Sequence, residues 1–352
     1  MPNANRILLT AQPESLRYAL HELRRIAPNA HPETGRADLA PGVIVVDMGA
    51  VSFATLTKTW SVTPPIFPRH IVPVDLQFSV NGRMADIATI RGGITSLIPH
   101  IMVETPVSVQ TRVFGEGLPY APFDINNALA DIIRAERGAA IDVRNPDQIL
   151  SVAVAGVPGQ FSAWVGLSRA TENLSDWAGG MRRFSREAGQ ISRAEFKLLE
   201  ACKIFGIAPQ ARGLALDLGA APGGWTRILR TAGMYVTAVD PADMHPSFKT
   251  DRDTRHLRMT TQAYLQREGD TYDWIVNDMR MDAMDSANLM VALAPQLRHE
   301  GVALMTLKLP EDDRIEDLIS AAFKHLEQVY VIRGARQLFH NRSEITVWLG
   351  RR

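Results

Sequence analysis

The sequence predicts an α/β protein with a doubly wound, mainly parallel sheet of about seven strands in its C-terminal part and an α+β region before it. Two observations predict this fold. From residue 192 onward, apolar runs of strand length alternate with helical patterns. Within that part, the apolar run 214–217 ends in a glycine-rich turn, and a helical pattern follows from Trp225. This is the first strand–turn–helix unit of a doubly wound sheet.

The N-terminal part reads as a small α+β region. A helix is expected after Ser15, and further helices near Ser52, over 85–99 and over 125–135. The proline-rich segment 62–73 is expected to be an irregular loop, either an RNA contact or a plain surface connection. Strands are predicted for the apolar or alternating runs at 5–10, 42–47, 107–114, 140–143, 149–155 and 161–167.

A polar, arginine-containing stretch at 172–190 is predicted to be a linker. We therefore expect an N-terminal α+β subdomain over 1–60, a second region over 61–180 and the doubly wound domain over 181–352. In that domain, helices are predicted at 192–205, 286–297 and 314–325. The strands after the glycine turn are expected at 235–240, 274–278, 301–309, 328–333 and 344–349, with a third strand that ends at Thr260 or Thr261 between the first two of these.

Composition narrows the class of protein. The 352 residues contain 38 Lys and Arg against 38 Asp and Glu, so a nucleic-acid surface would have to be a local patch. The single cysteine, Cys202, excludes an internal disulfide and a cysteine-rich zinc site. No apolar run has transmembrane length, and residues 1–16 lack the layout of a signal peptide. We expect a cytoplasmic protein without membrane contact.

The glycine turn carries the clearest binding signal. It differs from the GxGxxG of dinucleotide sites and lacks the Gly-Lys-Ser/Thr of a P-loop. An aspartate, a glycine and then Pro-Gly-Gly-Trp fit the first loop of S-adenosylmethionine (SAM) methyltransferases. An ordinary turn without ligand is the alternative, but Gly223-Gly224 packs poorly unless a ligand approaches the backbone. Asp240 ends the next strand. Its carboxylate there either accepts hydrogen bonds from the ribose hydroxyls of an adenosine ligand or stabilises the turn before Pro241.

Lys308 is an unusual residue in its context. It lies in the apolar run LMTLKLP, in a chain with far more arginines than lysines. Burial is expected to depress the pKa of its ammonium group, which would make the amine a usable base. Asp278 ends the preceding predicted strand and is expected beside it. The alternative is a lysine whose amine extends from the strand edge into solvent.

Four residues appear in the order of a known catalytic tetrad. Lys197, Asp278, Lys308 and Glu344 resemble the Lys-Asp-Lys-Glu set of the FtsJ/RrmJ-like ribose 2′-O-methyltransferases, and DLGAAPGGW resembles the SAM loop of that family. The segments LKLP and ARQLFHNRSEITV are similar to the RlmM-type branch, the 23S rRNA cytidine 2′-O-methyltransferases. The resemblance covers residues 192–349 and implies a Rossmann-like SAM-methyltransferase sheet.

The resemblance also implies roles for particular residues. Lys308 would be the base, with its pKa lowered by burial and by the neighbouring ammonium group of Lys197. Asp278 and Glu344 would fix the orientation of the two lysines and balance their charge. The RNA partner would be 23S rRNA or a ribosomal precursor, and no metal is implied. The SAM site would be lined by Ser192, Gly219, Ala221, Pro222, Gly223, Gly224, Trp225, Asp240 and Asp278.

Some features match the family less closely. Residues 138–167 resemble a THUMP RNA-binding domain, which implies a ferredoxin-like or THUMP-like RNA-binding region before the catalytic domain. The acidic residue expected near the SAM adenine is missing, and Thr260 or Thr261 stands there instead. The segment NDMRMD also departs from the family pattern after Asp278.

Three other functions stay open. An amino-group methyltransferase would carry Asn/Asp-Pro-Pro-Tyr/Phe where this chain has Asn-Asp-Met-Arg at 277–280. A metal-dependent O-methyltransferase could use Asp282 and Asp285 beside Asp278. A non-catalytic RNA-binding or ribosome assembly factor could retain the same fold. Within the leading class, tRNA or another structured RNA could replace 23S rRNA.

Overall fold

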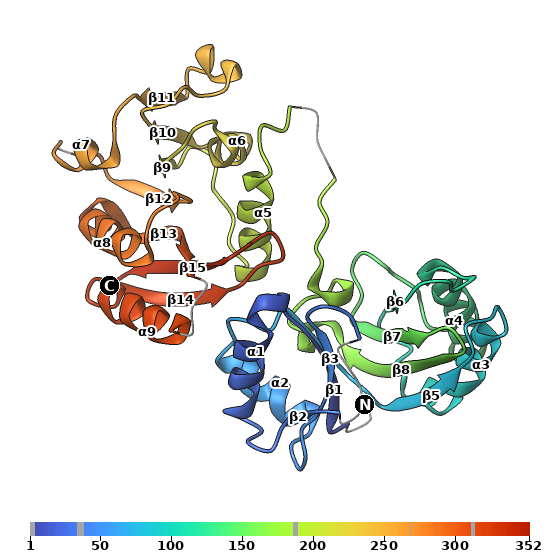
Figure 1. Cartoon of the computed structure of the whole chain (residues 1–352). Helices are drawn as coiled ribbons and strands as arrows, with labels where there is room; N and C mark the ends of the chain where they lie inside the picture. The colour runs from blue at the N-terminus through green and yellow to red at the C-terminus, as the bar shows by residue number, and fades with distance from the viewer. Residues whose placement is uncertain (1–3, 34–38, 186–188, 268, 311–313) are drawn as a thin grey trace. The chain divides into compact units, whose positions relative to one another are not determined.

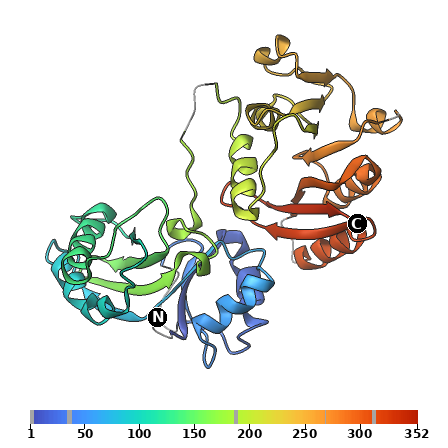
Figure 2. The ribbon, with the colours of Figure 1, turned by 180° about the vertical axis from the view of Figure 1, so that it is seen from behind.

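The computed structural model describes residues 4–33, 39–185, 189–267, 269–310 and 314–352. The chain divides into two compact units, Met1–Arg182 and Arg183–Arg352 (Figure 1; Figure 2 shows the reverse side). Part of the linker predicted over 172–190, residues 186–188, lies outside the described residues. Among the described residues, no helix combines the length and apolarity needed to cross a membrane.

The first unit contains two four-stranded sheets. The N-terminal sheet has the order β2-β3-β1-β4, with all pairs antiparallel. Three of its strands are buried along most of their length, and on one face residues such as Leu8, Val45 and Val72 pack on Trp164 of the second sheet. The elements of this part are β1 (Arg6–Thr10), α1 (Leu16–Arg24), β2 (His31–Pro32), β3 (Val43–Asp47), α2 (Phe53–Val62) and β4 (His70–Pro73).

The second sheet of this unit has the order β5-β8-β7-β6, with only β6 and β7 parallel. Helices α3 and α4 supply the apolar side chains that cover one of its faces, in a core that includes Ile90, Leu129 and Leu150. The elements are β5 (Leu76–Val80), α3 (Asp86–Gly93), β6 (Val107–Phe114), α4 (Pro122–Arg137), β7 (Gln148–Val157) and β8 (Gln160–Arg169).

Three predictions for the first unit were wrong in detail. The segment 62–73 is not wholly irregular, because β4 pairs with β1 even though it ends in Pro73. An edge strand tolerates proline, since one side of it makes no sheet hydrogen bonds. Residues 140–143 form no strand beyond a single bridge from Ile141 to Val107. The helix expected over 85–99 ends at Gly93 and continues as two 3-10 turns.

The second unit confirms the predicted Rossmann-like sheet. Its seven strands have the order β11-β10-β9-β12-β13-β15-β14. Strands β9 to β13 are parallel, and β15 is antiparallel to both neighbours. The strands are β9 (Leu214–Leu218), β10 (Tyr235–Val239), β11 (Thr254–Leu257), β12 (Tyr272–Asn277), β13 (Leu297–Lys308), β14 (Tyr330–Arg336) and β15 (Glu344–Arg351).

Helices cover both faces of this sheet, which is why its central strands are apolar throughout. One face carries α5 and α6, whose Leu198, Trp225 and Leu229 pack on Ala215, Trp274 and Leu304 of the sheet. Helices α8 and α9 pack on each other, α8 also contacts β13, and α9 also contacts β14 (Figure 1). The helices are α5 (Ala194–Phe205), α6 (Gly224–Thr231), α7 (Thr261–Leu265), α8 (Ala283–Leu293) and α9 (Ile315–Leu326).

Candidate active site

The glycine turn between β9 and α6 brings other chain segments close to its backbone. A Cβ atom added to Gly219 would lie 2.4 Å from Cγ of Met279, and one added to Gly223 would lie 2.2 Å from the ring of Phe248. Gly219 and Gly223 also have φ angles of +66° and +111°, which side-chain-bearing residues rarely adopt. The turn therefore requires glycine for both conformation and space.

Ser192 and Gly224 form one edge of this turn. A Cβ on Gly224 would lie 2.2 Å from the Ser192 hydroxyl oxygen. That oxygen is buried and has no hydrogen-bond partner in the described structure. A buried hydroxyl without a partner is costly, and a polar ligand at the turn would satisfy it. These features fit a SAM-type ligand passing along the loop.

Trp225 faces away from the turn. Its side chain is 3% exposed within the core, and its indole N–H donates to the carbonyl of Ala194. Ala221 and Pro222 belong to the turn itself, and the Ala221 N–H donates to the Asp240 carboxylate over 3.1 Å.

Asp240 directly follows β10, beside the turn. Its two oxygens accept the N–H groups of Ala221 and Ala242 at 3.1 and 2.7 Å. Thr260 caps α7 by accepting the Ala263 N–H, and the buried Thr261 hydroxyl donates to Sδ of Met279. Both threonines thus have local structural partners.

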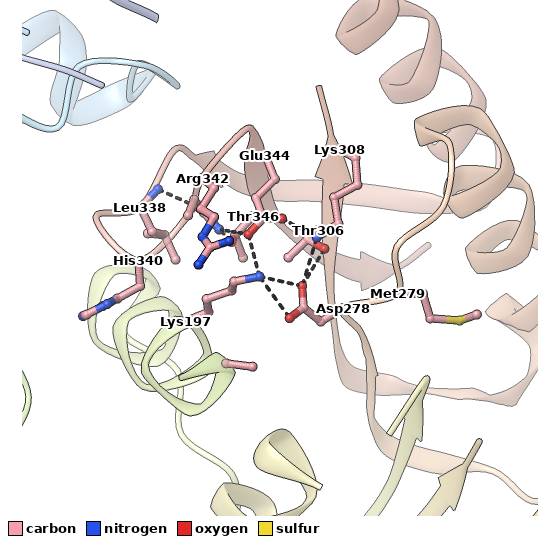
Figure 3. Close-up of polar contacts among 12 residues, drawn as sticks. Lys197, Asp278, Met279, Thr306, Lys308, Leu338, His340, Arg342, Glu344 and Thr346 are labelled. Atoms are coloured by element: carbon pink, nitrogen blue, oxygen red, sulfur yellow. Dashed lines mark hydrogen bonds and ion pairs between the residues drawn. The ribbon is translucent and has the colours of Figure 1, made fainter. Parts of the chain in front are cut away.

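The predicted tetrad comes together at the carboxyl ends of β12 and β13 (Figure 3). Nζ of Lys197, from α5, lies 3.0 and 3.1 Å from the two Asp278 oxygens and 2.5 Å from Oε1 of Glu344. Nζ of Lys308 lies 3.3 Å from Oδ1 of Asp278 and also forms an ion pair with Oε2 of Glu344. Each amine therefore bridges both carboxylates.

The four side chains are unequally exposed. Glu344 is 6% exposed, Lys197 16% and Lys308 25%, so Lys308 is the amine more open to a substrate. Burial by itself lowers the pKa of Lys197, but Asp278 and Glu344 outweigh it and raise that pKa. Burial likewise raises the pKa of Glu344, and the two ammonium groups outweigh it and lower that pKa. Lys197 and Glu344 are thus held as a charged pair.

Two supporting side chains were missed at the sequence level. The Thr306 hydroxyl donates to Oδ1 of Asp278 over 2.9 Å. Thr306 and Lys308 are two residues apart on β13 and so share a face, a spacing that could have revealed the threonine. The Asn341 amide donates to Oε1 of Glu344 at 3.4 Å, a contact between loop and strand that no local pattern predicts.

The metal-dependent alternative rested on Asp282 and Asp285. The Asp282 side chain caps α8 by accepting the Met284 N–H. Among the described residues, no three His, Cys, Asp or Glu side chains are grouped as metal ligands would be.

Family comparison agrees with the geometry at this edge of the sheet. Residues 190–335 match the FtsJ-like methyltransferase family. The predicted resemblance to that family is confirmed. The FtsJ-like segment includes the glycine turn, Lys197, Asp278 and Lys308, whereas Glu344 lies beyond it.

Relatives of known name extend the match. Ribosomal RNA large subunit methyltransferase M of Marinobacter nauticus is 36% identical over 205 residues, which cover 54% of this chain and 55% of that protein. The protein of the same name from Aromatoleum aromaticum is 29% identical over 327 residues, covering 86% of this chain and 82% of that protein. For most of these relatives, the aligned part spans about half their length.

Among solved structures, TrmN from Thermus thermophilus is 16% identical and covers 99% of both chains with a TM-score of 0.38. That likeness is too weak to support an argument. The assignment of the FtsJ-like segment therefore depends on its sequence and on the strand order described above.

Gly223→Ala is expected to weaken SAM binding at least about tenfold, because the new methyl group strains φ and displaces Phe248 beside the turn. Isothermal titration with SAM measures this. Gly206→Ala is the matched control, because Gly206 also has a positive φ, +65°, but no atom lies within 4 Å of its added Cβ. Equal affinities in both variants would contradict a ligand site at the turn.

Asp217 predicts a pH effect on stability. Burial raises the pKa of this carboxyl to about 7, while the Thr226 hydroxyl donates to it over 2.6 Å. The folded protein then holds a proton that the unfolded chain loses near pH 4. Stability contributed by this group therefore falls between about pH 4 and 7, by at most about 1.4 kcal/mol per pH unit.

Asp217→Asn removes that dependence. The free energy of unfolding of the variant minus that of the unmodified protein should increase from pH 5 to 7 and then level off, because only the unmodified protein loses stability over that range. Urea unfolding at several pH values measures it. A difference that stays constant over this range would show that Asp217 is ionised in the folded protein.

Proposed function

We propose that this protein is a SAM-dependent RNA methyltransferase that modifies a ribose 2′-hydroxyl, with 23S rRNA as the substrate. One observation carries the proposal: two amines and two carboxylates from α5, β12, β13 and β15 converge beside the glycine turn. The named relatives support the choice of rRNA. A cytoplasmic location belongs to the same proposal.

Lys308 is the proposed base. SAM, when bound, supplies a methyl group on a positively charged sulfur. The 2′-hydroxyl must lose its proton to attack that carbon, and Nζ of Lys308 would accept it. Lys197 stays charged, because it contacts both carboxylates at 3.1 Å or less.

The charge of the cluster suits this division of roles. With Lys308 neutral, one ammonium and two carboxylates remain, with a net charge of −1. A negative cluster favours a cationic donor beside it. Thr306 and Asn341 keep Asp278 and Glu344 oriented. The chemistry is thus mostly positioning, with one proton transfer.

The domains and the cofactor residues are assigned within the same proposal. Residues 1–60 would form an N-terminal α+β subdomain, 61–180 the THUMP-like RNA-binding region and 181–352 the catalytic domain. Structured RNA is recognised largely by shape and by unpaired nucleotides, which suits a separate capturing module. The SAM contacts would be Ser192, Gly219, Ala221, Pro222, Gly223, Gly224, the backbone of Trp225, Asp240 and Asp278.

Transfer of tritium from methyl-labelled SAM to 23S rRNA tests the proposal. Methylated ribose blocks alkaline cleavage of its 3′ phosphodiester, so the label should appear in alkali-resistant dinucleotides. Transfer should persist in EDTA. Label on a base would support the amino-group alternative, and loss of transfer in EDTA the metal-dependent one. RNA binding without transfer, to 23S rRNA, precursor particles or tRNA, would support an assembly factor.

A further inference from the structure

Three aromatic rings lie together, and two of them belong to segments that also carry tetrad residues. Phe196 immediately precedes Lys197 on α5, and its ring stacks with Phe184 at 5.7 Å between centroids, with planes 15° apart. The His340 ring lies 5.1 Å from Phe196 and 5.7 Å from Phe184. We call these three side chains the aromatic platform. All three are partly exposed, so the platform is not part of the buried core.

Hydrogen bonds to the buried Glu200 fix the loop that carries His340. The backbone N–H of Phe339 donates to Oε1 of Glu200 and that of His340 to Oε2, both over 2.9 Å. Glu200 lies on α5 and is 3% exposed. Asn341 accepts the Leu338 N–H and donates to Glu344 of the tetrad. The position of His340 is therefore coupled to that of the tetrad by consecutive residues (Figure 3).

The surroundings of the platform suit a polyanion. Arg342 follows on the same loop and Arg183 precedes Phe184, and both side chains are exposed. In the described structure, no carboxylate within ion-pair distance of Arg342 is recorded. Phe184 and Phe196 also line a hollow in the surface, together with Leu199, Gln190 and the ion pair between Arg227 and Glu195. Aromatic faces flanked by exposed guanidinium groups are the features that bind single-stranded nucleic acid.

We propose that the aromatic platform stacks an unpaired nucleobase of the RNA substrate, at or next to the nucleotide whose ribose is methylated. This inference rests on the proposed function and deepens it. An unpaired nucleotide must be fixed in place before its 2′-hydroxyl can react at Lys308. Stacking on Phe184, Phe196 and His340 would fix it, with Arg342 available to a phosphate.

The experiment compares His340→Ala and Phe184→Ala with the unmodified protein and with His340→Phe, which keeps a flat ring. Base stacking on an aromatic side chain contributes about 1–3 kcal/mol, so each alanine variant should lose roughly 5- to 150-fold in kcat/KM for RNA. His340→Phe should restore most of that loss. SAM affinity should be unchanged in all of them. Tyr235→Ala is the control, because Tyr235 is 45% exposed at the opposite end of the parallel strands.

A second measurement does not depend on catalysis. The fluorescence of 2-aminopurine in a single-stranded ribo-oligonucleotide should be quenched when the oligonucleotide binds the unmodified protein. The quenching should be weaker with either alanine variant. If quenching depends on the rings but no methyl is transferred, the platform stands and the proposed reaction fails. If kcat/KM and quenching for the two alanine variants match those of Tyr235→Ala, the aromatic platform does not stack a nucleobase. If His340→Ala unfolds, which circular dichroism detects, Phe184→Ala decides the outcome.

Discussion

Lys308→Ala is expected to lower kcat for methyl transfer by about 10²- to 10⁴-fold, the usual contribution of a general base. The loss should appear in kcat, because the amine acts on the hydroxyl that reacts. SAM affinity should change little, since the turn at 219–224 and Asp240 are formed by other segments. Single-turnover transfer of labelled methyl to RNA, together with SAM titration, measures both quantities.

Lys308→Arg separates proton acceptance from charge. Arginine keeps a positive charge beside Asp278 and Glu344 but stays protonated in proteins, so it should be as inactive as the alanine variant. Lys324→Ala is the matched control, because Lys324 is an exposed lysine of α9 in the same unit. Normal turnover with Lys308→Arg would show that the residue supplies charge and that the base is another group.

Glu344→Ala is expected to destabilise the protein by about 3 kcal/mol and to remove activity as well. It leaves two largely buried ammonium groups, Lys197 and Lys308, with Asp278 as their one remaining partner in the cluster. Breaking a buried ion pair by removing one partner typically costs 3–5 kcal/mol, and the partial exposure of Lys308 favours the lower end. Chemical unfolding measures the difference.

The pH dependence of that difference follows from the pKa shifts. Glu344 has a lowered pKa in the folded protein, so its contribution is fully present above its unfolded pKa and is lost as acid protonates it. Lys197 has a raised pKa, so its contribution persists below its unfolded value and is lost only at higher, alkaline pH. The cost of Glu344→Ala should therefore be constant from about pH 5 to 10 and shrink below about pH 4.

Glu300→Ala is the control for that experiment. Its side chain is 95% exposed and lies beside the exposed His299, so its removal should change stability by less than about 0.5 kcal/mol. If Glu344→Ala costs no more than Glu300→Ala, the carboxylate does not hold the two amines in the folded protein. The proposed tetrad would then lose its structural basis.

Local sequence patterns were sufficient to predict the main strands of the second unit. The apolar runs of β9, β10, β12 and β13 are buried on both faces, and such continuous runs mark parallel strands. Because parallel strands end at one edge, Asp240 and Asp278 could be assigned to that edge from the sequence. The first unit was less predictable, since β4 depends on pairing with β1, and the proline residues around it indicate a loop.

The sequence alone determined which residue types stand at the ends of the strands and where glycine is obligatory, because strand periodicity and backbone conformation are local properties. Only the tertiary structure decided that Lys197 from α5 and Glu344 from β15 meet Asp278 and Lys308. The tertiary structure also buries the Trp225 side chain in the core and packs the His340 ring against Phe196. Those contacts join segments up to about 150 residues apart, and packing between elements, not the pattern within any one of them, brings them together.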